Sequence, residues 1–290
     1  MEDKFHTIAH SIKDPQTLLF YMKKNKKDIF FWSFGILLIL FVYIFISSKD
    51  YSFLIVLSSL VQMLSFIIIL LKVISYESCS GLSYHTALCY VIILASRLTS
   101  TLFYHGYLPS DEAGDWFYQL TEIFTLLSAV GLLFLMKGKY HDTYDYQHDS
   151  LDYKYFVLPS LALAFLVHTS LNRNLLTDVM WTFSMYLETA AIVPQLLLFH
   201  SKKGQIEKYT SHFVALQGLS RLFSLLFWYD TYAELNETQT NSYSLLQEYC
   251  GYMVIASQVI QLIIMCDYYY FYFKSLWKGD GYMTISNDIL

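Results

Sequence analysis

The chain of 290 residues has little charge, few cysteines and no recognisable catalytic motif. Only 15% of its residues are charged, whereas a soluble domain has about a quarter, so the composition excludes an ordinary soluble protein. The cysteines form no C-x-x-C pair and have no histidine at ligand spacing. We therefore expect small buried side chains and no metal site or disulfide framework. The four are Cys79, Cys89, Cys250 and Cys266.

Basic residues are also too few and too scattered for a nucleic-acid partner, since the net charge is −5 and no long basic block occurs. The sequence lacks strand-like alternation, a glycine-rich nucleotide loop, a nucleophile–base pair and a metal-ligand constellation. It therefore predicts neither an enzyme nor a bound cofactor. A cleavable signal peptide is lacking too, because residues 1–28 are polar and the first apolar run, from Ile29, can direct its own insertion.

Long apolar runs, by contrast, are abundant, with 55% hydrophobic and 18% aromatic residues. A membrane-spanning helix needs roughly 20 mostly apolar residues, so each such run predicts one span. The sequence thus predicts an all-α membrane protein with short loops and no soluble domain. The eight candidate spans are about 29–47, 53–72, 87–105, 116–136, 155–171, 178–199, 212–231 and 249–273.

The positions of Lys and Arg predict how these spans are oriented. If all eight cross the membrane, fifteen of the 19 basic residues fall on one side and only Lys49 and Arg173 on the other. Because positive residues remain in the cytosol, both termini are expected there. The acceptor pattern Asn236-Glu237-Thr238 falls in a loop that this topology places in the lumen.

Charged residues inside the apolar runs predict a polar interior. Arg97, Arg221, Glu122, Glu188 and Asp267 all lie within spans. A charge near the bilayer centre costs at least ~2.5 kcal/mol, so these side chains should face the bundle interior and find partners. Two interpretations remain open: ion pairs that fix helix packing, or a cavity for an anionic or zwitterionic ligand. The guanidinium fork matches a carboxylate, which favours an anion in the second case.

A proline inside the sixth span predicts a bend in that helix. Pro194 frees a backbone carbonyl of the preceding turn, and Gln195 follows it directly. A Pro-Gln pair in such a span also occurs in PQ-loop transporters and in sugar carriers of similar architecture. The bend by itself requires no transport function.

Longer strings carry a specific resemblance. In their order and spacing over about residues 53–280, they resemble the KDEL receptors, which retrieve escaped lumenal proteins. The strings are Ser78-Cys79-Ser80-Gly81-Leu82-Ser83, Thr143-Tyr144-Asp145, Trp181-Thr182-Phe183-Ser184-Met185-Tyr186-Leu187-Glu188, Ala191-Ile192-Val193-Pro194-Gln195-Leu196, Thr210-Ser211-His212-Phe213 and Cys266-Asp267-Tyr268-Tyr269.

The resemblance implies a core of seven helices, in which two three-helix bundles are joined by a linking helix, as in PQ-loop and SWEET-type carriers. We assign this core to residues 52–274 and an additional transmembrane helix to 29–47. Residues 1–28 then form a cytosolic N-terminal segment and 275–290 a cytosolic tail. The extra helix keeps the family's core orientation while it places the N-terminus in the cytosol.

The resemblance also implies a site, a lumenal cavity that holds the C-terminal Lys-Asp-Glu-Leu of a cargo protein. Family arginines take the terminal carboxylate and family acids take the lysine. Arg97 and Arg221 match two of these arginines. The other matching positions are Trp181, Glu188 and Trp228, together with Asp178, which stands where the family has Glu.

Several family site residues are replaced. Gln62 occupies the position of the family's pH-sensing histidine, and since an amide does not titrate, the usual switch is lost. In the tail, only Lys274 and Lys278 remain of a coat-recruiting lysine cluster. The other replacements are Ile55 and Thr231 for arginines, Ser100 and Gly251 for acids, Ser220 and Ser224 for tyrosines, and Phe227 for Asn.

Three functional hypotheses follow. The first is a retrieval receptor of the endoplasmic reticulum and Golgi membranes that binds C-terminal peptide signals. The second is a degenerate family member that serves as a structural subunit of a membrane complex, in these or other organelle membranes. The third is a PQ-loop-type small-molecule carrier. We expect Arg97 and Arg221 to share one interior, and a Lys-Asp-Glu-Leu peptide to bind weakly or not at all, with little gain on acidification.

Overall fold

The computed structural model describes residues 51–108, 112–202, 205–236, 246–278 and 282–284, together with positions 33, 35, 37 and 44. The chain divides into two units, residues 1–46 and 47–290, and the second is considered below. The expected N-terminal segment 1–28 lies outside the described residues. So does the expected extra helix 29–47, apart from the four positions, and it therefore stays a prediction.

The described part of the second unit is almost entirely helical, and its helices fall on the expected apolar runs with edges shifted by a few residues. The sixth expected run, 178–199, is divided between α8 and α9. The helices are α4 (Ser52–Tyr76), α5 (Tyr84–Thr101), α6 (Glu112–Lys137), α7 (Lys154–Leu166), α8 (Leu175–Ala190), α9 (Val193–Ser201), α10 (Lys208–Asn236) and α11 (Cys250–Lys278), with short 3₁₀ turns η1 (His141–Thr143) and η2 (Gln247–Tyr249).

The break between α8 and α9 confirms the expected bend at Pro194, which stands in the first turn of α9 and cannot donate a backbone hydrogen bond. Gln195 ties this break to the start of α5. Its side-chain amide donates to the Gly81 carbonyl at 2.8 Å and accepts from the Ser83 N–H at 2.9 Å. Its own N–H donates to Thr86 Oγ1 at 3.0 Å. In this protein the Pro-Gln pair therefore has a structural role.

Four helical segments of the described residues are long and apolar enough to cross a membrane, judged by length and composition alone. Of the remaining expected spans, α7 has only 13 residues, while α5 and α10 carry the buried Arg97 and Arg221 among many hydroxyl side chains. The protein is thus an all-helical membrane protein in which seven expected spans are helical and four meet both criteria. The four are Ser52–Tyr76, Asp115–Lys137, Leu175–Ser201 and Gln247–Leu276.

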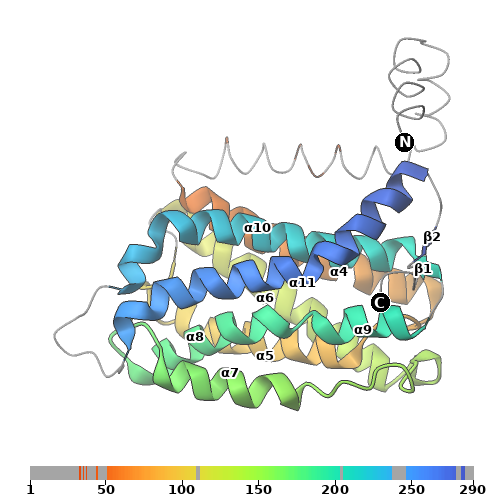
Figure 1. The fold of residues 1–290 in the computed structure, drawn as a ribbon, viewed down its shortest axis with the longest axis horizontal. Helices are drawn as coiled ribbons and strands as arrows, with labels where there is room; N and C mark the ends of the chain where they lie inside the picture. The colour runs from red at the N-terminus through yellow and green to blue at the C-terminus, as the bar shows by residue number, and fades with distance from the viewer. Residues whose placement is uncertain are drawn as a thin grey trace, which may run out of the picture. The chain divides into compact units, whose positions relative to one another are not determined.

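The main helix contacts close a ring of six helices in the order α4, α6, α5, α8, α11 and α10, with α10 again packed on α4. The short α7 packs on α8, outside this ring, and Figure 1 shows it at the lower edge. Each half of the ring contains three helices in the order first, third, second along the chain. This order matches the expected grouping into two three-helix bundles with α7 as the link.

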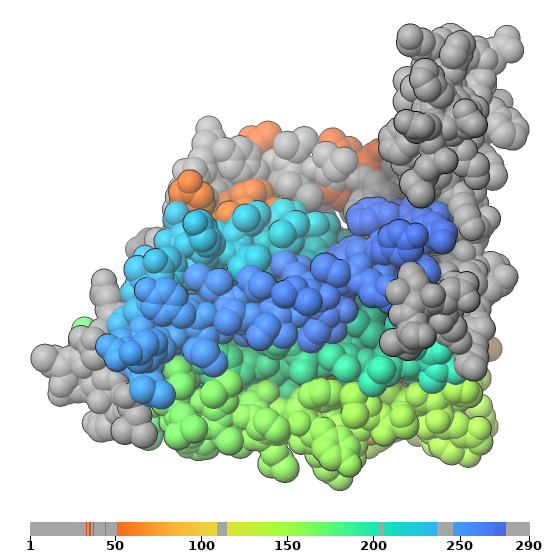
Figure 2. All heavy atoms as spheres, in the orientation of Figure 1, coloured from red at the N-terminus to blue at the C-terminus, as the bar shows by residue number. Residues whose placement is uncertain are grey.

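The polarity of the bundle is that of a membrane protein, with polar side chains inside and apolar ones outside. Gln62 and Gln217 are buried inside the ring at 1% and 0% exposure. On the outer side of α11, Ile260 and Ile263 are exposed. Figure 2 shows the face to which α10, α11 and α7 contribute.

One feature differs from the expected all-helical core. Strands β1 (Gln205–Glu207) and β2 (Tyr282–Thr284) pair antiparallel, with Ile206 opposite Met283. The segment 275–290, expected to be a tail, therefore adds a strand to the α9–α10 connection, and α11 itself runs on to Lys278. Three-residue strands are too short to show a period in the sequence, which is why this pairing was not expected.

Candidate functional site

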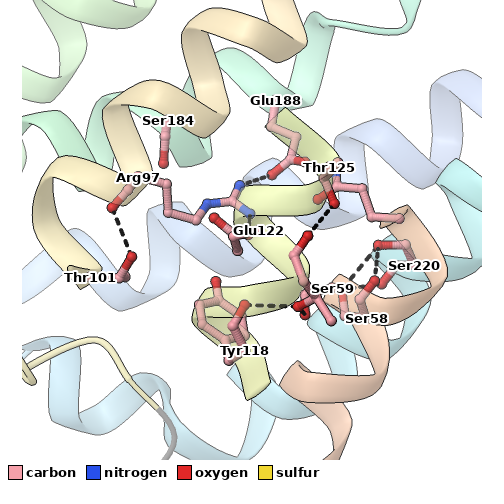
Figure 3. Close-up of polar contacts among 12 residues, drawn as sticks. Ser58, Ser59, Arg97, Thr101, Tyr118, Glu122, Thr125, Ser184, Glu188 and Ser220 are labelled. Carbon is pink, nitrogen blue, oxygen red and sulfur yellow. Dashed lines mark hydrogen bonds and ion pairs between the residues drawn. The ribbon is translucent and has the colours of Figure 1, made fainter. Parts of the chain in front are cut away.

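Arg97 and Arg221 meet inside the ring, as expected. Arg97 Nη1 lies 2.9 Å from Glu122 Oε1, and its Nη2 donates to Glu188 Oε2. Arg221 Nη1 contacts the same Glu188 oxygen at 2.6 Å. Figure 3 shows the Arg97 side chain reaching from its helix to Glu188, with Glu122 beside it. We call Arg97, Glu122, Glu188 and Arg221 the arginine cluster; its members come from α5, α6, α8 and α10.

The arginine cluster is electrically neutral, with two cations and two carboxylates, all buried at 4% exposure or less. Glu188 is fully used, since its second oxygen accepts from Gln62 Nε2 at 2.6 Å. Gln62 therefore contributes a permanent donor at the position where the resemblance placed a titrating histidine. Arg221 Nη2 donates to Ser220 Oγ at 3.0 Å, and Ser220 Oγ in turn donates to the Ser58 carbonyl at 2.8 Å.

Little space adjoins the arginine cluster. The cavity lined by Arg97 and Arg221 holds about 10 Å³, which is about enough for one water molecule. Among the described residues, Arg97 Nε, Arg221 Nε and Glu122 Oε2 have no hydrogen-bond partner. Because buried polar groups are almost always satisfied by protein or by water, ordered water fits these three atoms.

Aromatic side chains fill the cavity beside the cluster. Trp181 stacks on Tyr107, with ring centroids 4.1 Å apart and planes 10° apart. Trp228 packs edge-on against Trp181 at 5.3 Å and against Phe227 at 4.9 Å. Both predicted tryptophans thus line the cavity wall, but they pack on other aromatic side chains, and Ile55 adds further apolar surface.

Asp178, which the resemblance placed in the signal site, is hydrogen-bonded to a tyrosine and to the loop before α8. Tyr107 donates its hydroxyl to Asp178 Oδ1 at 2.5 Å. The backbone N–H groups of Asn172 and Asn174 donate to the same carboxylate at 3.1 and 3.0 Å. Asn174 is the N-cap of α8. Asp178 therefore fixes the loop before α8 and holds Tyr107 over Trp181.

Asp267 also differs from expectation. This acid lies within an apolar run, but its side chain is 52% exposed and lies 3.7 Å from Nε2 of His200. It lies on the outer face of α11, between the exposed Ile263 and Tyr270, whereas Tyr268 and Phe271 beside it are buried. Conversely, Glu122 and Tyr107 belong to the site although the resemblance did not point to them. The cost of a buried charge was a signal for Glu122, while Tyr107 lies in a loop and gave none.

The described residues contain no group of three or more His, Cys, Asp and Glu side chains that could hold a metal ion. Cys79, Cys89 and Cys250 are buried and Cys266 is exposed, and all four are free thiols. The arrangement offers buried ion pairing and hydrogen bonding, with no nucleophile beside a base at the arginine cluster. Such chemistry suits binding or packing.

The ring of helices around a buried polar centre defines a multi-pass membrane protein, and comparison with known proteins gives its class. A family model described as ER lumen protein retaining receptor matches residues 78–231, which is more than half of the chain. The chain belongs to this family, the KDEL receptors. These are receptors and not enzymes, in agreement with the expectation from the sequence.

Individual relatives are similar over most of their length. The ER lumen protein-retaining receptor of Entamoeba histolytica is 29% identical over 226 residues, covering 78% of this chain and 95% of the relative. ER lumen protein-retaining receptor 3 of Mus musculus is 27% identical over 224 residues, covering 77% and 94%. The receptor erd-2.1 of Caenorhabditis elegans is 28% identical over 225 residues, covering 77% and 93%.

Proposed function

We propose that this chain is a family member whose signal cavity is closed and which serves as a structural subunit of a membrane protein complex. The observation that carries this proposal is the neutral arginine cluster. Both arginines, which would hold a ligand's carboxylate, are already bound by Glu188, and the adjoining cavity measures about 10 Å³. A pocket for a peptide or a drug-sized molecule usually has roughly 300 Å³ or more.

The energetics support the same conclusion. A ligand carboxylate would have to displace Glu188 or Glu122 from a guanidinium, and a hydrogen bond to a charged group is worth about 1.5–3 kcal/mol. The displaced glutamate would remain buried without a partner, which costs about 3–5 kcal/mol. Two of the family's arginines, which could have offset these costs, are Ile55 and Thr231 here.

A second candidate is a retrieval receptor that binds the C-terminal signals of lumenal proteins in the endoplasmic reticulum and Golgi. One observation favours it: Arg97, Arg221, Trp181 and Trp228 line a single cavity, in the grouping that the resemblance implied. For this function Tyr107 would have to leave Trp181, and a glutamate would have to release its arginine. A small-molecule carrier faces the same requirement and has no observation of its own in its favour.

Calorimetry on the purified full-length chain tests the choice between these functions. We expect no saturable heat with a Lys-Asp-Glu-Leu peptide at neutral or mildly acidic pH, while the mouse relative serves as a control for the peptide and the buffer. Tight binding that occurs only at acidic pH would restore the receptor function and refute the argument from Gln62.

The structural role needs a positive result as well. A tagged full-length chain extracted in mild detergent should migrate on native gels in a complex well above its own mass, and its location in the cell identifies the membrane. A chain that migrates alone and also binds no peptide would contradict the proposal.

A further inference from the structure

A second cavity, of about 500 Å³, lies at the end of the bundle where the α4–α5 loop and the α9–α10 connection meet. The distribution of lysines predicts that these loops lie on the cytosolic side. The cavity is far larger than the one at the arginine cluster and lies at the opposite ends of α4 and α10. The proposed function uses none of its residues, so an inference drawn from it goes beyond that function.

Two ammonium groups converge on one residue of the cavity wall. Lys72 Nζ donates to the Ser80 carbonyl at 3.3 Å, and Lys202 Nζ donates to Ser80 Oγ at 3.1 Å. Lys72 is buried at 4% exposure. Burying one ammonium and placing a second beside it is unfavourable unless anionic groups compensate both.

Two carboxylates of the protein compensate these ammonium groups, and one of them also contacts a histidine. Glu207 Oε2 lies 2.7 Å from Lys72 Nζ, and Asp145 Oδ2 lies 2.9 Å from Lys202 Nζ. Asp145 also contacts His148 Nδ1 at 2.7 Å. Two ammonium groups thus face two carboxylates, one of which is shared with His148, and the cavity has room for a further anion.

A buried hydroxyl group gives an independent indication of a ligand. Thr210 lines the cavity and is only 1% exposed, yet its Oγ1 has no hydrogen-bond partner among the described residues. Gly81 also lines the cavity; it adopts a φ of +79° and faces open space, so its backbone can be approached closely. A buried donor, two ammonium groups and an accessible backbone are the groups that bind phosphate oxygens.

We propose that this cavity binds a phosphate monoester, with Lys72, Lys202 and Thr210 as its donors. Such a group carries up to two negative charges and three acceptor oxygens, which is enough to contact both ammonium groups and the hydroxyl at once. The monoester belongs either to a lipid headgroup or to a soluble phosphate. Tyr76 and Tyr209 form an exposed ring pair 6.2 Å apart beside the cavity, and such aromatic residues mark the headgroup level.

Binding to the purified full-length chain tests the site with three probes: a short-chain phosphatidylinositol monophosphate, inositol monophosphate and phosphatidylcholine. We expect saturable binding of the first, the second or both, and none of the third. The lipid alone identifies a headgroup site, and inositol monophosphate as the better ligand identifies a soluble phosphate. Equal binding of phosphatidylcholine, or none of either phosphate, would overturn the proposal.

Variants separate phosphate binding from a merely structural ion pair. K202A should weaken binding about tenfold or more, and T210V should weaken it several-fold while keeping the shape of the side chain. K154A is the matched control, because Lys154 lies at the same end, is exposed and pairs only loosely with Asp152 at 3.7 Å.

D145N is the decisive variant, because it removes the carboxylate that competes for Lys202. We expect tighter phosphate binding by several-fold. If D145N instead weakens binding as K202A does, the lysine and the carboxylate act only as a structural pair.

Discussion

The arginine cluster and the lysine-lined cavity both bring two cations together inside the protein, but they differ in what surrounds those cations. At the arginine cluster both guanidinium groups share Glu188 Oε2, and about 10 Å³ of space remains. At the lysine end each ammonium has its own carboxylate, and about 500 Å³ lies beside them. Buried cations with a shared internal anion and no space fix the packing of helices, whereas cations beside open volume remain able to bind a ligand.

Glu188→Gln should produce the largest effect, because it removes the anion that both arginines share. Removing one partner of a buried ion pair costs about 3–5 kcal/mol, and here two arginines lose the same partner. We expect a loss of at least this size in the free energy of unfolding, or failure to obtain a monodisperse protein. The exposed Glu234 on α10 supplies the control variant, E234Q.

Glu122→Gln should have a smaller effect and so distinguish the two glutamates. Arg97 keeps Glu188 in this variant, and the loss is confined to one charged hydrogen bond, worth about 1.5–3 kcal/mol. Thermal unfolding in detergent measures both variants side by side. Equal losses for E122Q and E188Q would show that Glu188 is not the centre of the cluster.

Asp178→Asn should loosen the packing of Tyr107 on Trp181 and leave the arginine cluster intact. It removes the charge that accepts from Tyr107 and from two backbone N–H groups, and a loss of about 1–2 kcal/mol is expected. Tryptophan fluorescence should change as Tyr107 leaves Trp181. Y107F removes the same hydroxyl contact without a change in charge, and it should reproduce the fluorescence change if the hydrogen bond is responsible.

The smallest effect is expected at the lysine end and depends on pH. The hydrogen bond from His148, followed by that from Lys202, lowers the pKa of Asp145 below its usual range. A lowered pKa in the folded state stabilises the protein above the ordinary carboxyl pKa, and this contribution is lost as the pH falls through the lowered value. D145N should therefore melt slightly below the wild type near neutral pH; the difference should begin to shrink at about pH 4 and vanish only below the lowered pKa of Asp145. A constant difference would contradict this assignment.

How far the sequence predicts the structure also differs between the two regions. Apolar runs located the helices because a membrane-spanning helix needs a minimum length and a mostly apolar composition. The free-energy cost of a charge in the membrane predicted that Arg97 and Arg221 face inward. The choice of Glu188 as their shared partner depends on how the ring closes, so no local pattern contains it. For the same reason the sequence placed Asp267 inside, although it lies on the outer face of α11 with Ile260 and Ile263 and is half exposed.

The lysine end was harder to predict, because it is built from loops. Ser80, Lys202 and Glu207 come from two connections that are distant along the chain, and their convergence follows from the packing of α4 against α10. The strand pair β1–β2 likewise joins two three-residue segments without any periodic signal. The positive-inside pattern predicted that lysines gather at this end, but it contained no information about a cavity among them.

The short α7 has a consequence for the synthesis of the protein. Its 13 residues form a helix of about 20 Å, shorter than the ~30 Å hydrocarbon core, and its main packing partner is α8. If α7 crosses the membrane as the sequence predicts, it is the odd helix between two triplets, and both halves of the ring enter the membrane from the same side. If the translocation machinery failed to insert it, α8 to α11 would be threaded in reverse, with Lys202 and Lys208 in the wrong compartment. The shortest of the expected spans therefore sets the orientation of half the bundle.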